Sequence, residues 1–277
     1  MSLWEAIVFG IVQGLSEYLP ISSTAHIVLT EMLLGYHFPG LGFEIFLHLA
    51  SVLAVIVYYR KDLIHLIGGF FRYIQTRAPE HRAPFWFATY LLIATAITGV
   101  LGIILQDFIS DSMKTPGFIA AALAVTGIMI ILTERLKKYG SRKAEEMKLF
   151  DAAVIGLCQT ASVLPGISRS GSTLIAALWL GLQREVAVRF SFLLVIPVVL
   201  GSTVLAITDI DAALWNQIGM PAIIVSFVAT FIFSLIGIKW LIAFLNRSKL
   251  IYFALYCFVL AICTYLFIEP GTPIGME

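Results

Sequence analysis

Two short stretches of polar and ionisable residues interrupt apolar segments of this sequence, and their side chains suit phosphate chemistry. The first stretch contains Gln13, Glu17, Ser22, Ser23, Thr24 and His26. The second contains Gln159, Ser162, Ser168, Arg169, Ser170, Ser172 and Thr173. Ionisable groups are costly inside apolar segments and usually have a function there. Hydroxyls and a guanidinium bind phosphate oxygens, whereas a carboxylate and an imidazole exchange protons with a reacting group.

Phosphate binding is the property that the two stretches predict most directly. Residues 22–24 (Ser-Ser-Thr) and 168–170 (Ser-Arg-Ser) each precede a predicted half-helix, whose N-terminal N–H groups and positive dipole end attract an anion. The guanidinium of Arg169 is a planar fork that matches phosphate oxygens, and Gly166 allows the backbone to approach closely. The residues that we expect to contact phosphate are Gln13, Ser22, Thr24, Gly166, Ser168, Arg169, Ser170 and Thr173.

The first stretch also has the side chains for catalysis. A carboxylate such as Glu17 in a partly dry site can act as a base or as a metal ligand. His26 follows Glu17 by nine residues, across the break, so both side chains can face one cavity. We take Glu17, Ser23, His26 and Arg169 as the catalytic candidates. A simpler interpretation is that Glu17 and Arg169 pair only to connect the two stretches, but a purely structural pair would not need so many hydroxyl groups around it.

The composition requires that these residues belong to a membrane protein. The chain has 277 residues, of which 60% are apolar and 13% charged, whereas soluble chains are about 45–50% apolar and about 25% charged. Its mean hydropathy is +0.95. An apolar core of this size could not be covered by the polar side chains available. We therefore predict an all-α polytopic membrane protein in which residues 1–277 form one integral membrane domain.

Six segments are long and apolar enough to cross a bilayer, which takes roughly 20 residues. They are 43–59, 84–105, 116–132, 186–207, 219–245 and 250–268, some of them only with their flanks. Two further apolar regions, 3–36 and 151–182, are interrupted by Pro, Gly, Ser and Thr, which end one helix and cap the next. Each arm has about 12–15 residues, too short to cross. Both regions are therefore predicted to be re-entrant helix–break–helix hairpins.

The two hairpins are related by an internal duplication. With a shift of 146 residues, nine of 30 aligned positions are identical. Each hairpin is then followed by three predicted spans in the same order, as expected for a repeated unit. We divide the chain into repeat 1 (1–132), a cytoplasmic linker (133–150) and repeat 2 (151–277).

Lys and Arg residues predict the orientation, because cytoplasmic loops of membrane proteins are enriched in them. One assignment places 15 of the 18 cationic residues inside, in the segments 60–82, 133–150, 184–189 and 247–249. The opposite loops are 106–115, 207–218 and 269–277, which contain only Lys114. Hairpin 3–36 then enters from outside and hairpin 151–182 from the cytoplasm. Such inverted repeats place their broken helices near the midplane, where the ligand site of these architectures lies.

Two motifs in these breaks make the sequence similar to one known family. Residues 13–17 (Gln-Gly-Leu-Ser-Glu) fit the (E/Q)xxxE signature of the undecaprenyl-diphosphate phosphatase family, also called bacitracin-resistance proteins. Residues 165–173 (Pro-Gly-Ile-Ser-Arg-Ser-Gly-Ser-Thr) fit the whole of its PGxSRSxxT signature. Residues 18–26 look like the family's segment with a required serine and histidine. The resemblance covers essentially the full length, including residues 190–194.

The resemblance implies a substrate, a cofactor and a location. Family members remove one phosphate from the C55 isoprenyl diphosphate carrier in the bacterial cytoplasmic membrane, which regenerates the monophosphate for peptidoglycan assembly and confers bacitracin resistance. They depend on a divalent cation, Mg²⁺ or Ca²⁺. Position 13 is Gln rather than Glu, so that Glu17 is the one carboxylate expected as a metal ligand, with phosphate oxygens and water completing the shell. This departure argues against direct ligation by Gln13.

The expected mechanism assigns different tasks to the two breaks. Arg169 and the N–H groups at the start of its half-helix bind the phosphates and stabilise the developing charge. Glu17, with the metal, orients and activates the attacking group. That group is Ser23 if a phospho-enzyme forms, or water if it does not. His26 assists as acid or base, or is itself the nucleophile. We expect the site to open to the outer side of the membrane.

A transporter or flippase for a phosphorylated lipid or anion is the main alternative, because inverted repeats with broken helices are common in transporters. The two motifs and His26 favour the hydrolase. The other common lipid-phosphatase superfamily needs a histidine six residues after its Ser-Arg pair, and this sequence has Ile175 there. That superfamily is therefore excluded.

A few further features have a weaker signal. Glu44 and His48, one helical turn apart at the outer start of a span, are additional candidates for lining the cavity. The charged run 134–148 is interpreted as a solvated cytoplasmic loop and gives no indication of a nucleic-acid partner. Gly and Ala residues along the helices would permit a homodimer. The expected partners are thus the prenyl diphosphate, membrane lipid and a second copy of the chain.

Overall fold

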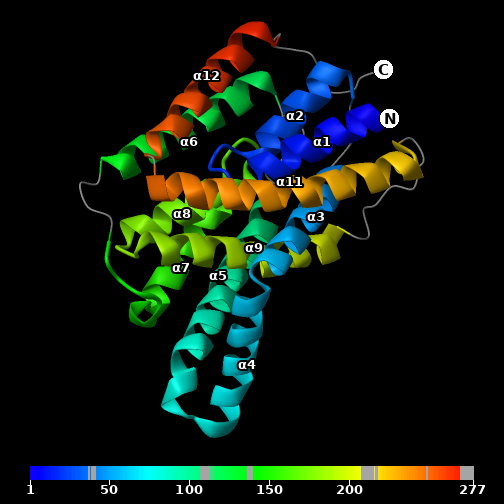
Figure 1. Cartoon of the computed structure of the whole chain (residues 1–277). Helices are drawn as coiled ribbons and strands as arrows, with labels where there is room; N and C mark the ends of the chain where they lie inside the picture. The colour runs from blue at the N-terminus through cyan, green and yellow to red at the C-terminus, as the bar shows by residue number, and fades with distance from the viewer. Residues whose placement is uncertain are drawn as a thin grey trace.

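The computed structural model describes residues 1–36, 38, 42–106, 113, 115–135, 140–206, 215, 218–247 and 249–268. Within these residues every regular element is a helix, apart from one isolated β-bridge between Arg142 and Leu182. The main helices are α1 (Leu3–Ser16), α2 (Ser23–Leu34), α3 (Gly42–Tyr58), α4 (Arg60–Thr76), α5 (Arg82–Gln106), α6 (Pro116–Glu134), α7 (Leu149–Thr160), α8 (Arg169–Trp179), α9 (Arg184–Ala206), α11 (Met220–Arg247) and α12 (Ile251–Phe267). Figure 1 shows their arrangement. The all-α class predicted from the sequence is confirmed.

Four helical segments are long and apolar enough to cross a membrane. They are Pro79–Leu105, Pro116–Glu134, Arg184–Leu205 and Met220–Leu245, and they match four of the six predicted spans. The other two predicted spans correspond to α3 and α12, which have 17 residues each, or about 25 Å of helix. The number of candidate spans is five if α3 and α4, which are bent by 78° at their junction, count as one.

The segment 60–82 differs from a simple cationic loop. Its residues form the helix α4 and the short 3₁₀-helix η1 (Pro79–His81), and α4 packs beside α5. Helix α4 and the first part of α5 project from the rest of the molecule as an antiparallel pair (Figure 1). Gly69 allows this contact, because a Cβ there would lie 2.6 Å from the Cβ of Pro84.

The predicted outer loops 106–115, 207–218 and 269–277 lie largely outside the described residues, as do Lys114, Lys137 and Lys138.

Both predicted hairpins consist of two short helices around a break. Their arms are α1 with 14 residues and α2 with 12, and α7 with 12 and α8 with 11. In the first break Pro20 is followed by Ser22, whose φ of +68° is unusual for a residue with a side chain. In the second break the 3₁₀-helix η4 (Ala161–Val163) precedes Pro165 and Gly166, and the φ of Gly166 is +96°. Each break therefore contains a residue with a positive φ.

Each hairpin packs its first arm against a long helix from the other half of the chain. Helix α1 packs along α11, and α7 packs along α5. Gly10 and Gly156, which are equivalent in the duplication, make these close contacts. A Cβ on Gly10 would lie 2.8 Å from the carbonyl oxygen of Ser226, and a Cβ on Gly156 would lie 2.8 Å from that of Ala94. Identical glycines therefore permit equivalent helix contacts in the two halves.

The open end of the second hairpin is closed by Arg142. Its guanidinium donates to both carboxylate oxygens of Asp151, at 2.9 and 2.6 Å, and to the carbonyl oxygen of Leu180 at 2.7 Å. The hydrogen bond to Asp151 raises the pKa of Arg142. Because Asp151 lies in the first turn of α7 and Leu180 caps α8, this one residue connects the two arms.

Candidate active site

The carboxylate of Glu17 is the centre of the candidate active site. Glu17 directly follows the last residue of α1 and is 4% exposed. Its Oε1 accepts a hydrogen bond from the guanidinium of Arg169. Its Oε2 lies 2.8 Å from Gln13 Nε2, 2.7 Å from Ser23 Oγ and 3.1 Å from His48 Nε2. Side chains from α1, α2, α3 and α8 thus converge on one acidic group.

Arg169 brings the second break to this carboxylate. It is the first residue of α8 and lies 152 residues after Glu17 in the chain. A second contact joins the breaks nearby, because Ser170 Oγ donates to the carbonyl oxygen of Leu19 at 3.0 Å. Gly171 permits the approach, since a Cβ there would lie 3.3 Å from the Cβ of Pro20. The structure therefore places the two sequence motifs side by side.

The three hydroxyls of residues 22–24 have different surroundings. Ser23 Oγ donates to Glu17 Oε2 at 2.7 Å, which is the arrangement of a nucleophile and its base. Ser22 is instead the N-cap of α2 and accepts a hydrogen bond from the N–H of Ala25 at 3.3 Å. Thr24 lies in the first turn of α2 and is partly exposed. Of the three, Ser23 is thus the residue that the fold connects to the acidic centre.

The side chains of the predicted phosphate-binding residues in the second break mostly form hydrogen bonds with the backbone. Ser168 Oγ accepts the N–H of Gly171 at 3.0 Å as the N-cap of α8, and Thr173 Oγ1 donates to the carbonyl oxygen of Arg169 at 3.1 Å. Gly166 packs against α6, where a Cβ would lie 2.7 Å from the Cβ of Ala122. Anion binding at this helix end would therefore depend on the Arg169 guanidinium and on the first-turn N–H groups other than that of Gly171, since the first N–H groups of a helix have no acceptor within it.

His26 lies on α2, one turn beyond the N-cap, and both of its ring nitrogens have partners. Nδ1 is 2.7 Å from the carbonyl oxygen of Ser22, and Nε2 is 2.7 Å from the hydroxyl of Tyr256 on α12. The His26 and Tyr256 rings are parallel, with centroids 5.6 Å apart. The structure thus separates His26 from the immediate partners of Glu17 and connects it to the last helix.

His48 is a site residue to which the sequence gives little weight. Its Nε2 is 3.1 Å from Glu17 Oε2, and its Nδ1 is 2.7 Å from the carbonyl oxygen of Glu44. The i, i+4 spacing of Glu44 and His48 is the only sequence signal for this contact. Tyr256 is a second such residue, and its position in an apolar helix gives no signal at all. In both cases the information lies in the packing of distant helices.

The donors around Glu17 fit a hard cation such as Mg²⁺ or Ca²⁺. Gln13 Oε1 is buried and accepts no hydrogen bond from the described residues, and it belongs to the side chain whose Nε2 contacts Glu17. Glu17 and Ser23 supply further oxygen atoms. In the part of the chain that the structure describes, no group of three or more His, Cys, Asp and Glu residues gathers to hold a metal. A cation here would therefore take its remaining ligands from phosphate and water.

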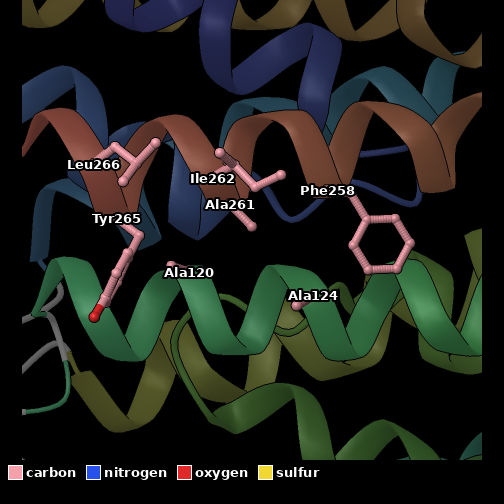
Figure 2. A pocket seen from close by; sticks show the side chains of 7 residues that line it. All are labelled: Ala120, Ala124, Phe258, Ala261, Ile262, Tyr265 and Leu266. Atoms are coloured by element: carbon pink, nitrogen blue, oxygen red, sulfur yellow. The ribbon is translucent and has the colours of Figure 1, made fainter.

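A separate apolar groove lies between α6 and α12, with a volume of about 400 Å³ (Figure 2). Its walls are formed by Ala120, Ala124, Phe258, Ala261, Ile262, Tyr265 and Leu266. The groove has almost no polar surface, so it has the character of a contact for lipid chains rather than of a reaction site. The ionisable groups that could carry out chemistry are at Glu17, not here.

Comparisons with known proteins identify the family to which the chain belongs. Residues 6–263 match the family described as bacitracin resistance protein BacA. Undecaprenyl-diphosphatase 2 of Halalkalibacterium halodurans is 56% identical over the whole of both chains. Undecaprenyl-diphosphatase 1 of Shouchella clausii is 53% identical over 96% of this chain and 97% of its own. Undecaprenyl-diphosphatase 3 of Bacillus anthracis is 40% identical over 95% and 96%, respectively. The chain therefore belongs to the bacitracin resistance protein BacA family.

Proposed function

We propose that this protein is an undecaprenyl-diphosphate phosphatase, which hydrolyses undecaprenyl diphosphate to undecaprenyl phosphate and inorganic phosphate. The observation that carries the proposal is the contact of Glu17 with both Arg169 and Ser23, which joins a carboxylate base, a cation suited to phosphate and a candidate nucleophile at the two breaks. The names of the relatives support this substrate. The family name supports a role in bacitracin resistance, and regeneration of the lipid monophosphate would serve peptidoglycan synthesis.

Arg169 and the first turn of α8 are proposed to bind the diphosphate. A phosphate group could replace the Glu17 carboxylate as a partner of the guanidinium, because both are anions that match its geometry. The N-terminus of α8 would add backbone donors and the positive end of the helix dipole. These groups would stabilise the charge that develops on the terminal phosphate as the anhydride bond breaks.

Glu17 is proposed to activate the attacking oxygen. In one route Ser23 Oγ transfers its proton to Glu17 and forms a bond to the terminal phosphorus, while the bridging P–O bond breaks and undecaprenyl phosphate leaves. Water then hydrolyses the phosphoserine. In the other route Glu17 takes the proton of a water molecule, which attacks directly. The distance of 2.7 Å between Ser23 Oγ and Glu17 supports the first route. In either route His26 would exchange protons with the phosphates.

A divalent cation, Mg²⁺ or Ca²⁺, is proposed as the cofactor. Glu17 would be its carboxylate ligand, and the buried Gln13 Oε1 supports adding Gln13 to the ligand set, contrary to the expectation from the sequence. When bound, the cation would neutralise charge on the diphosphate oxygens. Gln13 and Ser23 would orient Glu17 toward it.

We further propose the arrangement of six spans and two re-entrant hairpins in inverted repeats, with the site open to the outer side of the bacterial cytoplasmic membrane. Several contacts support it. Arg189 pairs with Asp62 at 2.7 Å, Arg184 donates to the carbonyl oxygen of Leu245, and Glu134 accepts the N–H of Leu250. These contacts gather the helix ends that the charge pattern assigns to the cytoplasm. In contrast, the Met1 amine is 3.4 Å from the carbonyl oxygen of Ile218, in a predicted outer loop.

A homodimer is also part of the proposal. Gly117 on α6 and Gly201 on α9 have no described atom beyond their own helix within 4 Å of the place where a Cβ would be. Small residues on a lipid-facing surface allow a helix of a second copy to approach closely. Light scattering of the purified protein in detergent tests this part, because a mass of one chain would contradict it.

Phosphate release from a prenyl diphosphate by the purified protein, with and without EDTA, tests the proposed function. We expect release of one phosphate per lipid, loss of activity with EDTA, and recovery with added Mg²⁺ or Ca²⁺. The same protein in vesicles is assayed for movement of the labelled lipid between leaflets. Lipid movement without hydrolysis would contradict the proposal and favour a transporter or flippase, the alternative that the broken helices also suit.

A further inference from the structure

The partners of the His26 ring determine where its proton lies. Nδ1 is 2.7 Å from the carbonyl oxygen of Ser22, and a carbonyl oxygen can only accept, so Nδ1 must carry a hydrogen. Nε2 is 2.7 Å from the Tyr256 hydroxyl, which can donate or accept. An imidazolium would place a charge among apolar helices, which is costly. The ring is therefore neutral, with its Nε2 lone pair accepting the Tyr256 O–H.

Tyr256 is held at this position by the fit of α12 against the first break. The next residue, Cys257, is buried, and its Sγ lies 3.8 Å from the carbonyl oxygen of Pro20. The Tyr256 ring is parallel to that of His26, with an interplanar angle of 5°. Tyr256 is 43% exposed on an apolar helix, where a hydroxyl without a partner would be unfavourable. Two adjacent residues of α12 thus contact the break that carries Glu17 and His26.

We propose that Tyr256 is a positioning residue for His26: its hydroxyl donates to Nε2 and keeps this nitrogen an oriented proton acceptor, in the tautomer that the Ser22 carbonyl sets. This inference rests on the proposed phosphatase function for its effect on catalysis. The orientation of a functional histidine depends on what its second nitrogen contacts. Here Ser22 and Tyr256 contact the two nitrogens from opposite sides of the ring, and Tyr256 comes from the far end of the chain.

Replacement of Tyr256 by phenylalanine tests the effect on the reaction. Tyr256→Phe keeps the parallel ring and removes only the hydroxyl. We expect kcat for farnesyl diphosphate hydrolysis to fall on the order of 10-fold with KM nearly unchanged, as is typical for a residue that orients a functional histidine. Tyr265→Phe is the matched control on the same helix, since Tyr265 lines the apolar groove and is 65% exposed. Its kcat should equal that of the wild type. Activity is divided by the amount of protein in the monodisperse peak from size-exclusion chromatography.

A chemical readout tests the His26 contact without relying on activity. Diethyl pyrocarbonate acylates the free lone pair of a neutral imidazole. Tyr256→Phe should raise the rate of His26 modification several-fold, measured by peptide mass spectrometry, while His65 and His81 react as in the wild type. An increase in modification together with the fall in kcat supports the proposal. An increase with kcat unchanged would mean that the contact is only structural, and a fall in kcat without the increase would mean that Tyr256 acts elsewhere; either result overturns it.

A double variant completes the test. In a His26→Asn background, Tyr256→Phe should leave the residual kcat unchanged within about 2-fold, because residues that act through one group are not additive. A further fall on the order of 10-fold would overturn the proposal. A wild-type protein that fails to hydrolyse any prenyl diphosphate would instead contradict the proposed function, and the modification rates would still decide whether Tyr256 controls Nε2.

Discussion

At the scale of single residues, the negative charge of Glu17 is the property on which the proposed reaction depends most. Glu17→Gln keeps the size of the side chain and removes its ability to take a proton from Ser23 or water. We expect kcat to fall by at least about 100-fold, as positioned acid–base groups typically contribute this much. Phosphate release at saturating lipid measures it. Glu185→Gln, at an exposed position in the first turn of α9, should be unaffected, and a fully active Glu17→Gln protein would contradict the assignment.

His48 is predicted to restrict the Glu17 carboxylate from the side opposite Arg169. His48 Nε2 lies 3.1 Å from Glu17 Oε2, and this is one of three side-chain contacts of that oxygen atom. His48→Ala should lower kcat on the order of 10-fold, in the range for residues that orient a ligand or base. His48→Gln, whose amide can still donate to Oε2, should recover part of this loss. His65→Ala, on exposed α4, serves as the control. Wild-type kcat in His48→Ala would show that the contact has no role.

The residues of the site were predictable from the sequence to the extent that they share a motif. The two breaks predict Glu17, Ser23 and Arg169, and the structure connects all three. His48 and Tyr256 were not predictable in this way, because their contacts with Glu17 and His26 depend on how α3 and α12 pack against the first hairpin. The sequence also does not reveal that Thr173 Oγ1 donates to its own helix. The number of hydroxyl groups in the two breaks therefore overstates how many side chains are available to bind a phosphate.

At the scale of helices, the contact between α1 and α11 sets the position of Glu17 and depends on glycine. A Cβ on Gly14 would lie 2.7 Å from both the N atom of Ser234 and the carbonyl oxygen of Thr230, and these backbone atoms cannot move independently. Gly14→Ala should therefore destabilise the protein by about 1–3 kcal/mol and lower its Tm by roughly 2–12 °C. It should also reduce kcat, because α1 carries Gln13 and ends beside Glu17.

Gly99→Ala is the matched control for this change. Gly99 lies within α5, and the space where its Cβ would be has no described atom within 4 Å. Alanine is favoured over glycine in a helix, so Tm should be unchanged or slightly higher. Thermal unfolding in detergent, followed by size-exclusion chromatography, compares the two variants. Equal Tm values would mean that α1 does not pack against α11 through Gly14.

The helices themselves were predictable to different degrees. Both breaks and the four long apolar helices follow from the positions of Pro, Gly and long apolar runs. The helix α4 does not, because its Arg and Lys residues resemble a charged loop when only composition is considered. Its exposed apolar residues Ile64, Ile67 and Phe71 recur at helical spacing, so periodicity is the signal that distinguishes it. The bend of 78° between α3 and α4 has no comparable signal in the sequence.

At the scale of the whole molecule, the few charged residues of the chain are divided between two separate purposes. Most cationic residues lie in segments near helix ends, and three of them connect neighbouring helices there. Arg142 pairs with Asp151, Arg189 pairs with Asp62, and Arg184 donates to the carbonyl oxygen of Leu245. Glu17 and Arg169 are instead buried or half-buried between the two hairpins. This separation is what allows a chain with 13% charged residues to have both a defined orientation and a charged site. Because the charges that set the orientation are separate from those of the site, the proposed orientation can be tested independently of activity.

The inverted arrangement of the hairpins predicts that their open ends lie on opposite sides of the membrane. We expect Ser2→Cys, before α1, to react with an impermeant maleimide in intact cells, and Glu145→Cys, before α7, to react only after permeabilisation. Both are exposed positions. The variants are made in a background without Cys158, Cys257 and Cys263 that retains phosphatase activity. Labelling of both positions from one side would contradict the inverted repeat, because the two hairpins would then enter from the same face of the membrane. Labelling from opposite sides in the reverse order would keep the repeat and turn the site toward the cytoplasm.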